Sequence, residues 1–473
     1  MNMTKWSFIK RIAACAMVFI VAVGMCGCGE TSSSGGTDSG TVSISIGGWP
    51  TTEGEELDAM NARKEAFEQT YSDITIMPDT WTFDLQTFYP KAEAGLLPNV
   101  FQNHFSDMGK LIDGGYVADL TDELEALGYY DKLNPSIMEC ISKEGRVYAI
   151  PSSCYILGLA YNADLFEAAG LLEADGTPRQ PQDWNELAEM AVQIKEATGQ
   201  PGFIMTTSNN AGGWLFTNIA WSYGVDFMEQ DTDGNWHATF NTDEAAEALQ
   251  FISDLKWVYD VLPANTLIDN TEARKTFATG GGAMLLIGSD VGTVVSRYEM
   301  DPTSLGMMAL PAGPKRHVAL LGGTLQCVSE TSTDEQISAV IKWMDYSGTG
   351  YLFDDSAKAN LDADMALDIS NGVAVGIKPL RVWKDDAEKT VYQNQLIDDN
   401  YNMRPNAARL YNESLSNTDI EWQAEEPVCA QDLYGILDNC IQQVLTDQNA
   451  DIKAILEKAN TDFQTNYLDN LTY

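Results

Sequence analysis

The sequence predicts an α/β protein of two lobes, and three observations support that fold class. A chain of 473 residues is long enough to form two hydrophobic cores. Near its beginning, two strand-like segments flank a helical one, which is the order of elements in a β-α-β unit with parallel strands. Between Gly145 and Gly170, two strand-like runs of different patterning flank a Pro-Ser-Ser break, which indicates a chain that passes from one sheet to another.

The first strand is predicted at residues 42–46, where apolar residues alternate with serine. A helix with one core face and then a second strand follow between residues 57 and 77, because the apolar residues recur first at helical and then at strand spacing. Residues 97–101 enter a third strand, and a polar loop at 104–107 follows its C-terminal end. Open α/β sheets bind ligands outside the carboxyl ends of their strands, which makes Trp49 and this loop candidate contacts.

After the crossover, a long helix is predicted to open at residues 181–187, where an aspartate and a glutamate three positions later fit a helix cap and its reciprocal partner. A segment rich in glycine and tryptophan follows at 209–227. An Asp-Gly-Asn sequence within residues 231–236 predicts a hairpin turn. The rest of the chain is predicted to be largely helical and to end with helices at 432–445 and 451–467.

Residues 1–28 have the pattern of an export signal. A positively charged start is followed by an uncharged apolar run at 12–25, which is too short to span a bilayer comfortably. The next Met-Cys-Gly-Cys sequence resembles a lipobox, in which the matching cysteine, Cys28, is lipidated and becomes the new N-terminus. Cys26 is the alternative, but it would put a bulky methionine at the cleavage site. Residues 29–41, rich in Gly, Ser and Thr, predict a flexible tether.

Charge and motif content narrow the functional classes. The net charge of −41 argues against a nucleic-acid partner, because phosphate binding needs a basic face, and such acidity keeps an exported protein soluble. Five cysteines remain beyond Cys28, without zinc or redox spacing, and their pairing stays open: Cys140, Cys154, Cys327, Cys429 and Cys440. The sequence has no hydrolase, kinase, dehydrogenase or metal motif, although a glycosidase needs only two carboxylates.

Five segments carry a resemblance to a known family: residues 94–101, 145–151, 158–162, 181–187 and 277–288. In order and spacing they are similar to the extracellular sugar-binding lipoproteins of bacterial ABC transporters (family 1, maltose-binding-protein-like). The resemblance implies a two-lobed, periplasmic-binding-protein-like fold, in which each lobe is a mostly parallel sheet flanked by helices. It also implies a hinge between the lobes, where the chain crosses near Pro151 and Ala319.

The same resemblance implies a division of the chain and a function. The N-terminal lobe would comprise residues 42–152 and 320–352, and the C-terminal lobe residues 153–319 and 353–473. The implied protein is a monomeric binder without a cofactor, held at the outer face of the cell membrane by its lipid. It would capture a carbohydrate, in particular an oligosaccharide, and deliver it to an ABC permease. A binder of another polar solute, such as a peptide, and an anchored carbohydrate-active enzyme stay open as alternatives.

A sugar presents apolar C–H faces and a rim of hydroxyl groups, so its binders combine flat aromatic rings with groups that hydrogen-bond in fixed directions. Position along the chain and the family resemblance select these candidates: Trp214, Tyr155, Trp49, His104, Asp107, Asp290, Trp383 and Tyr434. Trp214 comes first, because it follows two glycines outside any periodic pattern and matches a position where the family places a ring under the sugar. Packing in the core is the alternative for the aromatic residues, and a helix cap is the alternative for Asp107.

Overall fold

A six-stranded mixed sheet forms the first half of the fold in the computed structural model, which describes residues 41–471. The strand order is β13-β12-β3-β1-β2, and β6 pairs with β12 off this path. The strands are β1 (Val42–Ile46), β2 (Ile74–Pro78), β3 (Val100–His104), β6 (Ala149–Ile156), β12 (Val318–Val328) and β13 (Glu421–Ala424). β1 runs parallel to β2 and β3, and β12 runs parallel to β13 but antiparallel to β3 and β6. The predicted β-α-β start with parallel strands is confirmed.

The second sheet has three strands, with β7 (Gly158–Asn162) between β10 (Met284–Ile287) and β11 (Leu305–Met308). Both neighbours run antiparallel to β7, so the prediction of a mostly parallel sheet is wrong for the named strands of this lobe. All five residues of β7 are buried. A strand buried on both faces is a continuous apolar run whatever the direction of its neighbours, so its pattern does not indicate their direction.

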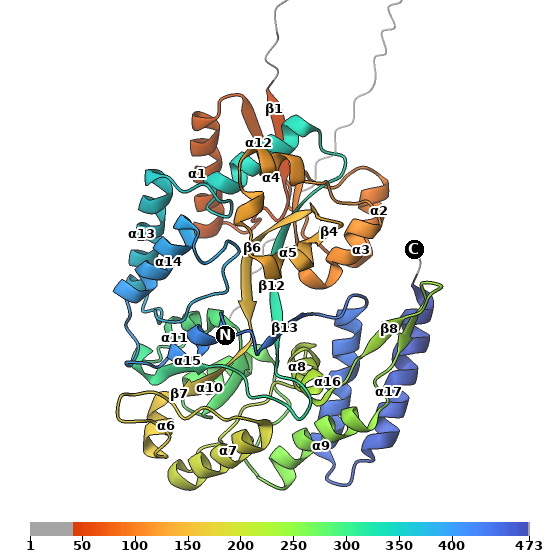
Figure 1. The fold of residues 1–473 in the computed structure, drawn as a ribbon, viewed down its shortest axis with the longest axis vertical. Coiled ribbons are helices and arrows are strands. Elements are labelled where there is room, and N and C mark those ends of the chain that lie inside the picture. Colours follow the sequence, from red (N-terminus) through yellow and green to blue (C-terminus); the bar gives the residue numbers. More distant parts are fainter. Residues whose placement is uncertain (1–40, 472–473) are drawn as a thin grey trace, which may run out of the picture. The chain divides into compact units, whose positions relative to one another are not determined.

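Two long strands, β6 and β12, connect the regions of the two sheets and run side by side (Figure 1). Their pairing extends from Leu321 opposite Ile156 to Cys327 opposite Ala149. At Gly323, φ is +159°, and a Cβ atom would lie 2.1 Å from the carbonyl oxygen of Ser153, so this close approach needs glycine. The expected crossing positions Pro151 and Ala319 both lie within these strands.

Helices cover both sheets, and α12 contacts β1 while α1 contacts β2. The helices up to the middle of the chain are α1 (Glu55–Thr70), α2 (Leu85–Glu93), α3 (Met108–Asp113), α4 (Thr121–Ala126), α5 (Pro135–Ile141), α6 (Ala163–Ala168), α7 (Trp184–Thr198) and α8 (Ala211–Tyr223). The later helices are α9 (Asp243–Trp257), α10 (Asn270–Ala278), α11 (Gly292–Arg297), α12 (Asp334–Tyr346), α13 (Asp355–Ser370), α14 (Glu388–Asp399), α15 (Arg409–Ser414), α16 (Ala430–Thr446) and α17 (Ile452–Asn466).

Local signals in the sequence explain several of these elements. The Asp183 side chain accepts a hydrogen bond from the backbone N–H of Glu186 and caps α7, as predicted. The predicted hairpin turn joins β8 (Met228–Gln230) to β9 (Trp236–Ala238), and the Asp231 carboxylate accepts two backbone N–H bonds inside it. A further short hairpin pairs β4 (Ser142–Lys143) with β5 (Arg146–Val147).

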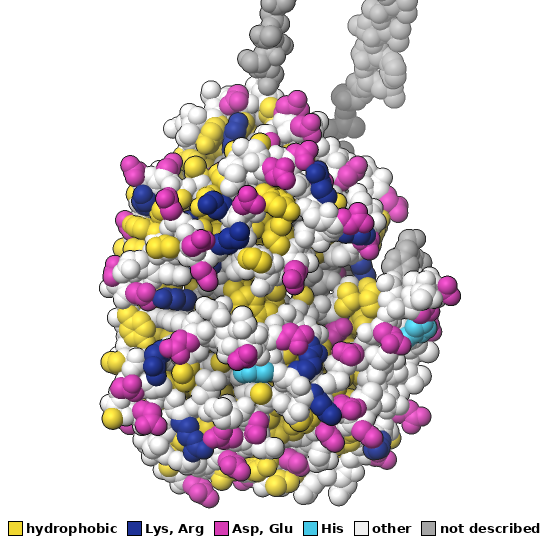
Figure 2. Space-filling view, viewed as in Figure 1, with side chains coloured by type: hydrophobic (Ala, Val, Ile, Leu, Met, Phe, Trp, Pro, Cys, Tyr) yellow, Lys and Arg dark blue, Asp and Glu magenta, His cyan; other side chains and the backbone are white. Residues whose placement is uncertain are grey.

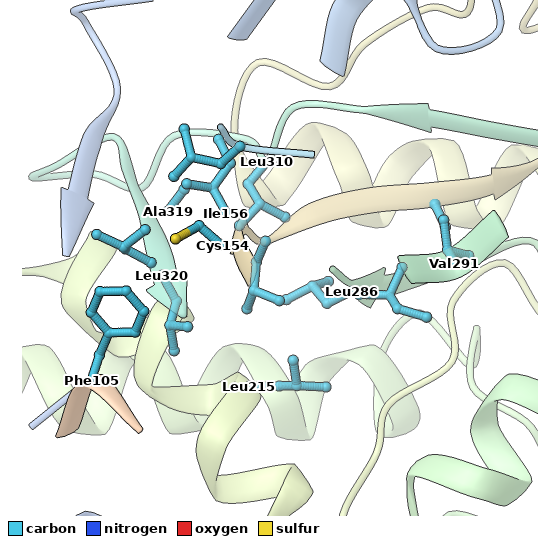
Figure 3. Packing of buried hydrophobic residues seen from close by; sticks show 14 of the residues in the cluster. Phe105, Cys154, Ile156, Leu215, Leu286, Val291, Leu310, Ala319 and Leu320 are labelled. Carbon is cyan, nitrogen blue, oxygen red and sulfur yellow. The ribbon is translucent and has the colours of Figure 1, made fainter. Parts of the chain in front are cut away.

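Apolar side chains from both crossing strands meet in the core. Figure 3 shows Cys154 and Ile156 of β6 near Ala319 and Leu320 of β12, with Leu215 of α8 on the opposite side. The five cysteines of the described part are all free thiols. Between residues 41 and 471, no helix is long and apolar enough to cross a membrane, and no cluster of His, Cys, Asp and Glu could hold a metal ion.

Residues after 352, which the sequence assigns to the C-terminal lobe, also contact residues that it assigns to the N-terminal lobe. Trp383 packs edge-on against Tyr129 and Tyr351, at 6.1 and 5.0 Å between ring centroids. The ammonium group of Lys389 donates to the carbonyl oxygen of Gly348 at 2.9 Å. A boundary at residue 352 therefore separates residues that touch one another.

Candidate ligand-binding site

Two adjoining cavities lie beside the crossing strands and share Tyr155 and Trp214 as a common wall. Their volumes are about 230 and 500 Å³. Tyr155 comes from β6 and Trp214 from the first turn of α8, and both side chains are half-buried. Their ring centroids are 6.5 Å apart and the ring planes meet at 83°. Two apolar faces at nearly a right angle form a corner that can hold a flat apolar surface on either side.

The smaller cavity, called here the first cavity, is lined by residues from several elements that lie far apart in the sequence. His104 lies at the C-terminal end of β3 and Gly323 in β12, while Gln431 and Tyr434 lie on α16. Asn209, Asn210 and Ala211 at the start of α8 and Glu425 just after β13 complete the lining with Tyr155 and Trp214. The first cavity therefore combines aromatic faces with amide, imidazole and carboxylate groups.

The larger cavity, called here the second cavity, contains an ion pair. The Arg274 guanidinium contacts the Asp290 carboxylate at 2.7 Å, so the two charges compensate each other. Apolar residues of β10 and the backbone around Gly288 form much of the remaining wall. The exposed Asp290 carboxylate keeps oxygen lone pairs that can accept further hydrogen bonds.

Close packing of α8 against α16 fixes the position of Trp214. The carboxylate of Asp438 on α16 accepts hydrogen bonds from the backbone N–H groups of Asn210 and Gly213, each at 2.7 Å. Gly213 has no room for a side chain, because a Cβ atom would lie 2.1 Å from the carbonyl oxygen of Tyr434. Asn210 adopts a left-handed conformation with φ of +66°, which asparagine tolerates better than most residues. The two glycines thus lie inside the first turn of α8.

The half-buried Glu425 lies at one end of the first cavity, and the buried Asp107 is close enough to act on it. Burial raises the pKa of Glu425, and the charge of Asp107 raises it further, while His104 and the hydroxyl groups of Tyr434 and Ser106 lower it. Burial also raises the pKa of Asp107, which is 9% exposed, although Lys110 and His104 oppose that shift. Removing a carboxylate from water without a full set of partners disfavours its charged form.

Tyr434 lies next to Glu425 and also lines the first cavity. Its side chain is 1% exposed, and among the described residues its hydroxyl group makes no hydrogen bond of ordinary geometry, although the Glu425 carboxylate lies near it. Burial and the negative charge of Glu425 together raise the pKa of this hydroxyl well above its ordinary value, so it is a neutral hydrogen-bonding group. A buried polar group without a partner is uncommon and calls for an explanation.

The structure brings together most of the candidates chosen from the sequence. His104, Tyr155, Trp214 and Tyr434 line the first cavity, and Asp290 lines the second. Asp107 does not line either cavity, but its charge acts on Glu425. Two rings lie elsewhere: Trp49 is 4% exposed and stacks on Trp343 at 6.4 Å, and Trp383 is 3% exposed among Tyr129 and Tyr351.

Several lining residues were not among the candidates, namely Asn209, Asn210, Arg274, Glu425 and Gln431. Glu425 directly follows β13, so the rule that ligands bind at the carboxyl ends of strands would have selected it. The four residues of β13 are too few, and too polar, to be recognised as a strand. The asparagines and Arg274 reach the site only through tertiary packing.

The buried Glu426, next to Glu425, makes stability depend on pH. Its carboxylate accepts a hydrogen bond from Nε1 of Trp221 at 2.9 Å, but burial raises its pKa to about 7 and the charge of Asp226 adds to the shift. The ordinary value is 4.5, so the native state binds more protons than the unfolded state between these pH values. The contribution of Glu426 to stability is therefore full below about pH 4.5 and falls as pH rises through about pH 7, by about 3 kcal/mol at about 1.4 kcal/mol per pH unit.

We expect Glu426→Gln to remove this dependence, because glutamine still accepts from Trp221 but cannot ionise. Urea denaturation should find the variant close to the native protein near pH 5 and more stable near pH 8, by up to about 3 kcal/mol. A stability difference between Glu426→Gln and native protein that does not vary with pH would contradict the assignment.

A fold of two sheets joined by crossing strands, with a cavity of rings and polar groups beside the crossing, defines a solute-binding protein. Residues 49–349 match the family described as "Bacterial extracellular solute-binding protein". The chain belongs to this family, and the family expected from the sequence is confirmed.

Curated relatives match over shorter stretches. The chain is 25% identical over 233 residues to the lactose-binding protein of Rhizobium radiobacter, covering 47% of this chain and 49% of that protein. It is 27% identical over 132 residues to the arabinooligosaccharide-binding protein of Halalkalibacterium halodurans, covering 28% of this chain and 27% of that protein. The matched regions thus span about half, or less, of these relatives' length.

Solved structures confirm the fold along most of the chain. The cyclic α-maltosyl-1,6-maltose binding protein from Arthrobacter globiformis superposes with a TM-score of 0.62 at 22% identity, over 89% of this chain and 98% of that one. UgpB from Mycobacterium tuberculosis, solved with glycerophosphocholine, gives 0.63 at 16% identity, over 90% and 98%. At these identities the likeness establishes a two-lobed α/β fold of the periplasmic-binding-protein type.

Proposed function

We propose that this protein is a lipid-anchored extracellular binding protein that captures a carbohydrate and delivers it to an ABC importer. The observation that carries the proposal is the corner formed by Tyr155 and Trp214, which borders both cavities. Sugar rings stack on such faces, while the amides of Asn209, Asn210 and Gln431 can hydrogen-bond the hydroxyl groups. Two adjoining cavities suit an oligosaccharide, with one end on each side of the corner. The names of the lactose- and arabinooligosaccharide-binding relatives support the same ligand class.

Capture between two lobes accounts for the arrangement of the first cavity. His104 comes from the first sheet, whereas Trp214 comes from α8 on the other side of the crossing strands. We place the lobes at residues 42–152 with 320–352 and at 153–319 with 353–473, with the hinge near Pro151 and Ala319. A ligand that touches both sides favours the closed arrangement by its extra contacts.

A thermal-shift screen with oligosaccharides of different composition and linkage tests the proposal. A ligand at 100 times its dissociation constant adds about 2.7 kcal/mol to the stability of the folded state, which raises the unfolding temperature measurably. We expect at least one oligosaccharide to do so. A response to peptides or other polar solutes, with none to any carbohydrate, would contradict it and favour the alternative that the glycerophosphocholine-bound neighbour illustrates.

An anchored carbohydrate-active enzyme is the second candidate, because Glu425 and Asp107 place two carboxylates near the first cavity. Incubation with the oligosaccharide identified in the screen distinguishes the two functions. A binder returns the sugar intact, whereas an enzyme releases shorter products. Appearance of such products, and their loss in Glu425→Gln, would overturn the assignment as a binding protein.

Anchoring depends on Cys28, which lies outside the described residues. Cys28→Ala is expected to prevent lipid attachment, so that the protein is released from membranes or stays unprocessed. Labelling with radioactive palmitate followed by membrane fractionation measures both effects. Cys26→Ala is the matched control and should keep the label. Palmitate still incorporated into Cys28→Ala would contradict the proposed anchor.

A further inference from the structure

The Glu425 end of the first cavity presents a carboxyl group, and no lysine or arginine lies in the cavity wall. His104 is the one basic group among the lining residues. In the part of the chain that the structure describes, Glu425 forms no ion pair, and Asp107 adds a second negative charge nearby. A partly buried carboxylate in this position is costly unless a cation or several hydrogen-bond donors approach it.

The Tyr434 hydroxyl, which lies close to the Glu425 carboxylate, is a second indication that a ligand group belongs here. It is buried and lines the same cavity, and among residues 41–471 no group makes a hydrogen bond of ordinary geometry with it. Buried hydroxyl groups in native proteins are nearly always paired, either within the protein or with a bound molecule. A donor placed between this hydroxyl and the Glu425 carboxylate would satisfy both groups together.

The rings around the first cavity favour the same kind of group. Tyr155, Trp214 and Tyr434 all line it, and the first two meet at 83°. The face of an aromatic ring carries partial negative charge and attracts a cation within about 6 Å of its centre. Three such rings and one carboxylate form a pocket suited to a positively charged group. The second cavity differs, because Arg274 and Asp290 neutralise each other there.

We propose that the first cavity binds the protonated amino group of an amino sugar, while a neutral part of the same ligand occupies the second cavity. The inference rests on the proposed carbohydrate binding and specifies its ligand class. The ammonium group donates to the Glu425 carboxylate and to the oxygen of the Tyr434 hydroxyl, and the rings of Trp214 and Tyr155 lie against it. The net charge of −41 also favours the approach of a cationic solute. Figure 2 shows acidic side chains spread over the visible face among fewer basic ones.

Calorimetric titration with glucosamine di- and trisaccharides and with their N-acetylated forms tests the inference. Acetylation removes the positive charge and keeps the sugar skeleton. At about pH 6, where the amines are protonated, we expect the amino form to bind about tenfold or more tightly than the acetylated form. Glu425→Gln should abolish this preference, because glutamine keeps the shape of the side chain but carries no negative charge. Asp432→Asn removes the same charge from an exposed position on α16 and should keep the preference.

Tyr434→Phe and Glu425→Gln together test whether the two groups recognise the amino group. Tyr434→Phe removes only the hydroxyl group and should weaken binding of the amino form several-fold more than binding of the acetylated form. Equal affinity of native protein for both forms, or a preference that survives in Glu425→Gln, would overturn the inference and leave carbohydrate binding intact. Failure of every charged and neutral carbohydrate to bind would instead overturn the proposed function, and the inference with it.

Discussion

Replacement of Trp214 by alanine is expected to weaken binding of the captured oligosaccharide by about thirtyfold or more while leaving the folded state close to native stability. The side chain is half-buried and belongs to the walls of both cavities, so its removal deletes the shared corner with Tyr155. Loss of an aromatic anchor that is desolvated on binding costs about 2 kcal/mol or more. The backbone of α8 remains held by Asp438, because those hydrogen bonds do not involve the indole.

Calorimetric titration and urea denaturation of the Trp214→Ala variant measure the two effects separately. Trp221 on the same helix is the matched control: it is fully buried and its indole nitrogen donates to Glu426. Trp221→Phe should lower the denaturation midpoint and keep the affinity. Unchanged affinity in Trp214→Ala together with a collapsed midpoint would assign Trp214 to the core instead.

Gly213→Ala, one residue earlier, should in contrast lower the stability of the folded state. The added methyl group would lie 2.1 Å from the carbonyl oxygen and 2.6 Å from the Cα atom of Tyr434. Both are backbone atoms, which cannot rotate aside, so α8 and α16 must move apart. We expect a loss of about 3 kcal/mol or more in the free energy of unfolding. Binding should weaken as well, since the displaced helices carry Trp214 and Tyr434.

Gly435, on α16, provides the control for this substitution. A Cβ atom there would meet only the side-chain oxygen of Asn210, at 3.2 Å. Because alanine favours a helix over glycine by about 1 kcal/mol, Gly435→Ala should be neutral or slightly stabilising. Chemical denaturation of both variants checks the pair. A native midpoint for Gly213→Ala would show that the two helices do not meet through their backbones.

Short sequence patterns correctly predicted several elements of the fold. Local patterns located the cap of α7, the β8–β9 hairpin and the crossing at β6, because each depends on neighbouring residues. Position along the chain was also informative, since His104 at the end of β3 and Tyr155 in the crossing strand β6 both line the first cavity. The direction in which a side chain points could not be predicted from the sequence. Trp49 follows a strand end as expected, but its ring packs against Trp343.

The remaining features depend on contacts between distant segments. In the second sheet, β10 and β11 both pair antiparallel with β7. The sequence of a buried apolar strand does not indicate the direction of its neighbours. Glu425 faces the first cavity because β13 adds to β12, a parallel pairing of segments about a hundred residues apart. The glycines before Trp214 lie in a helix because Tyr434 and Asp438 pack against them. Such contacts become visible only in the folded chain.

A crystal structure of the protein with the oligosaccharide that most raises its unfolding temperature tests the central claim most directly. We expect a sugar ring to stack on Trp214 beside Tyr155, and polar groups of the same ligand to contact His104 from the first sheet and Tyr434 from α16. One ligand would then touch elements on both sides of the crossing strands. A sugar bound away from Tyr155 and Trp214, or one that contacts only one side of the crossing, would contradict capture between the lobes.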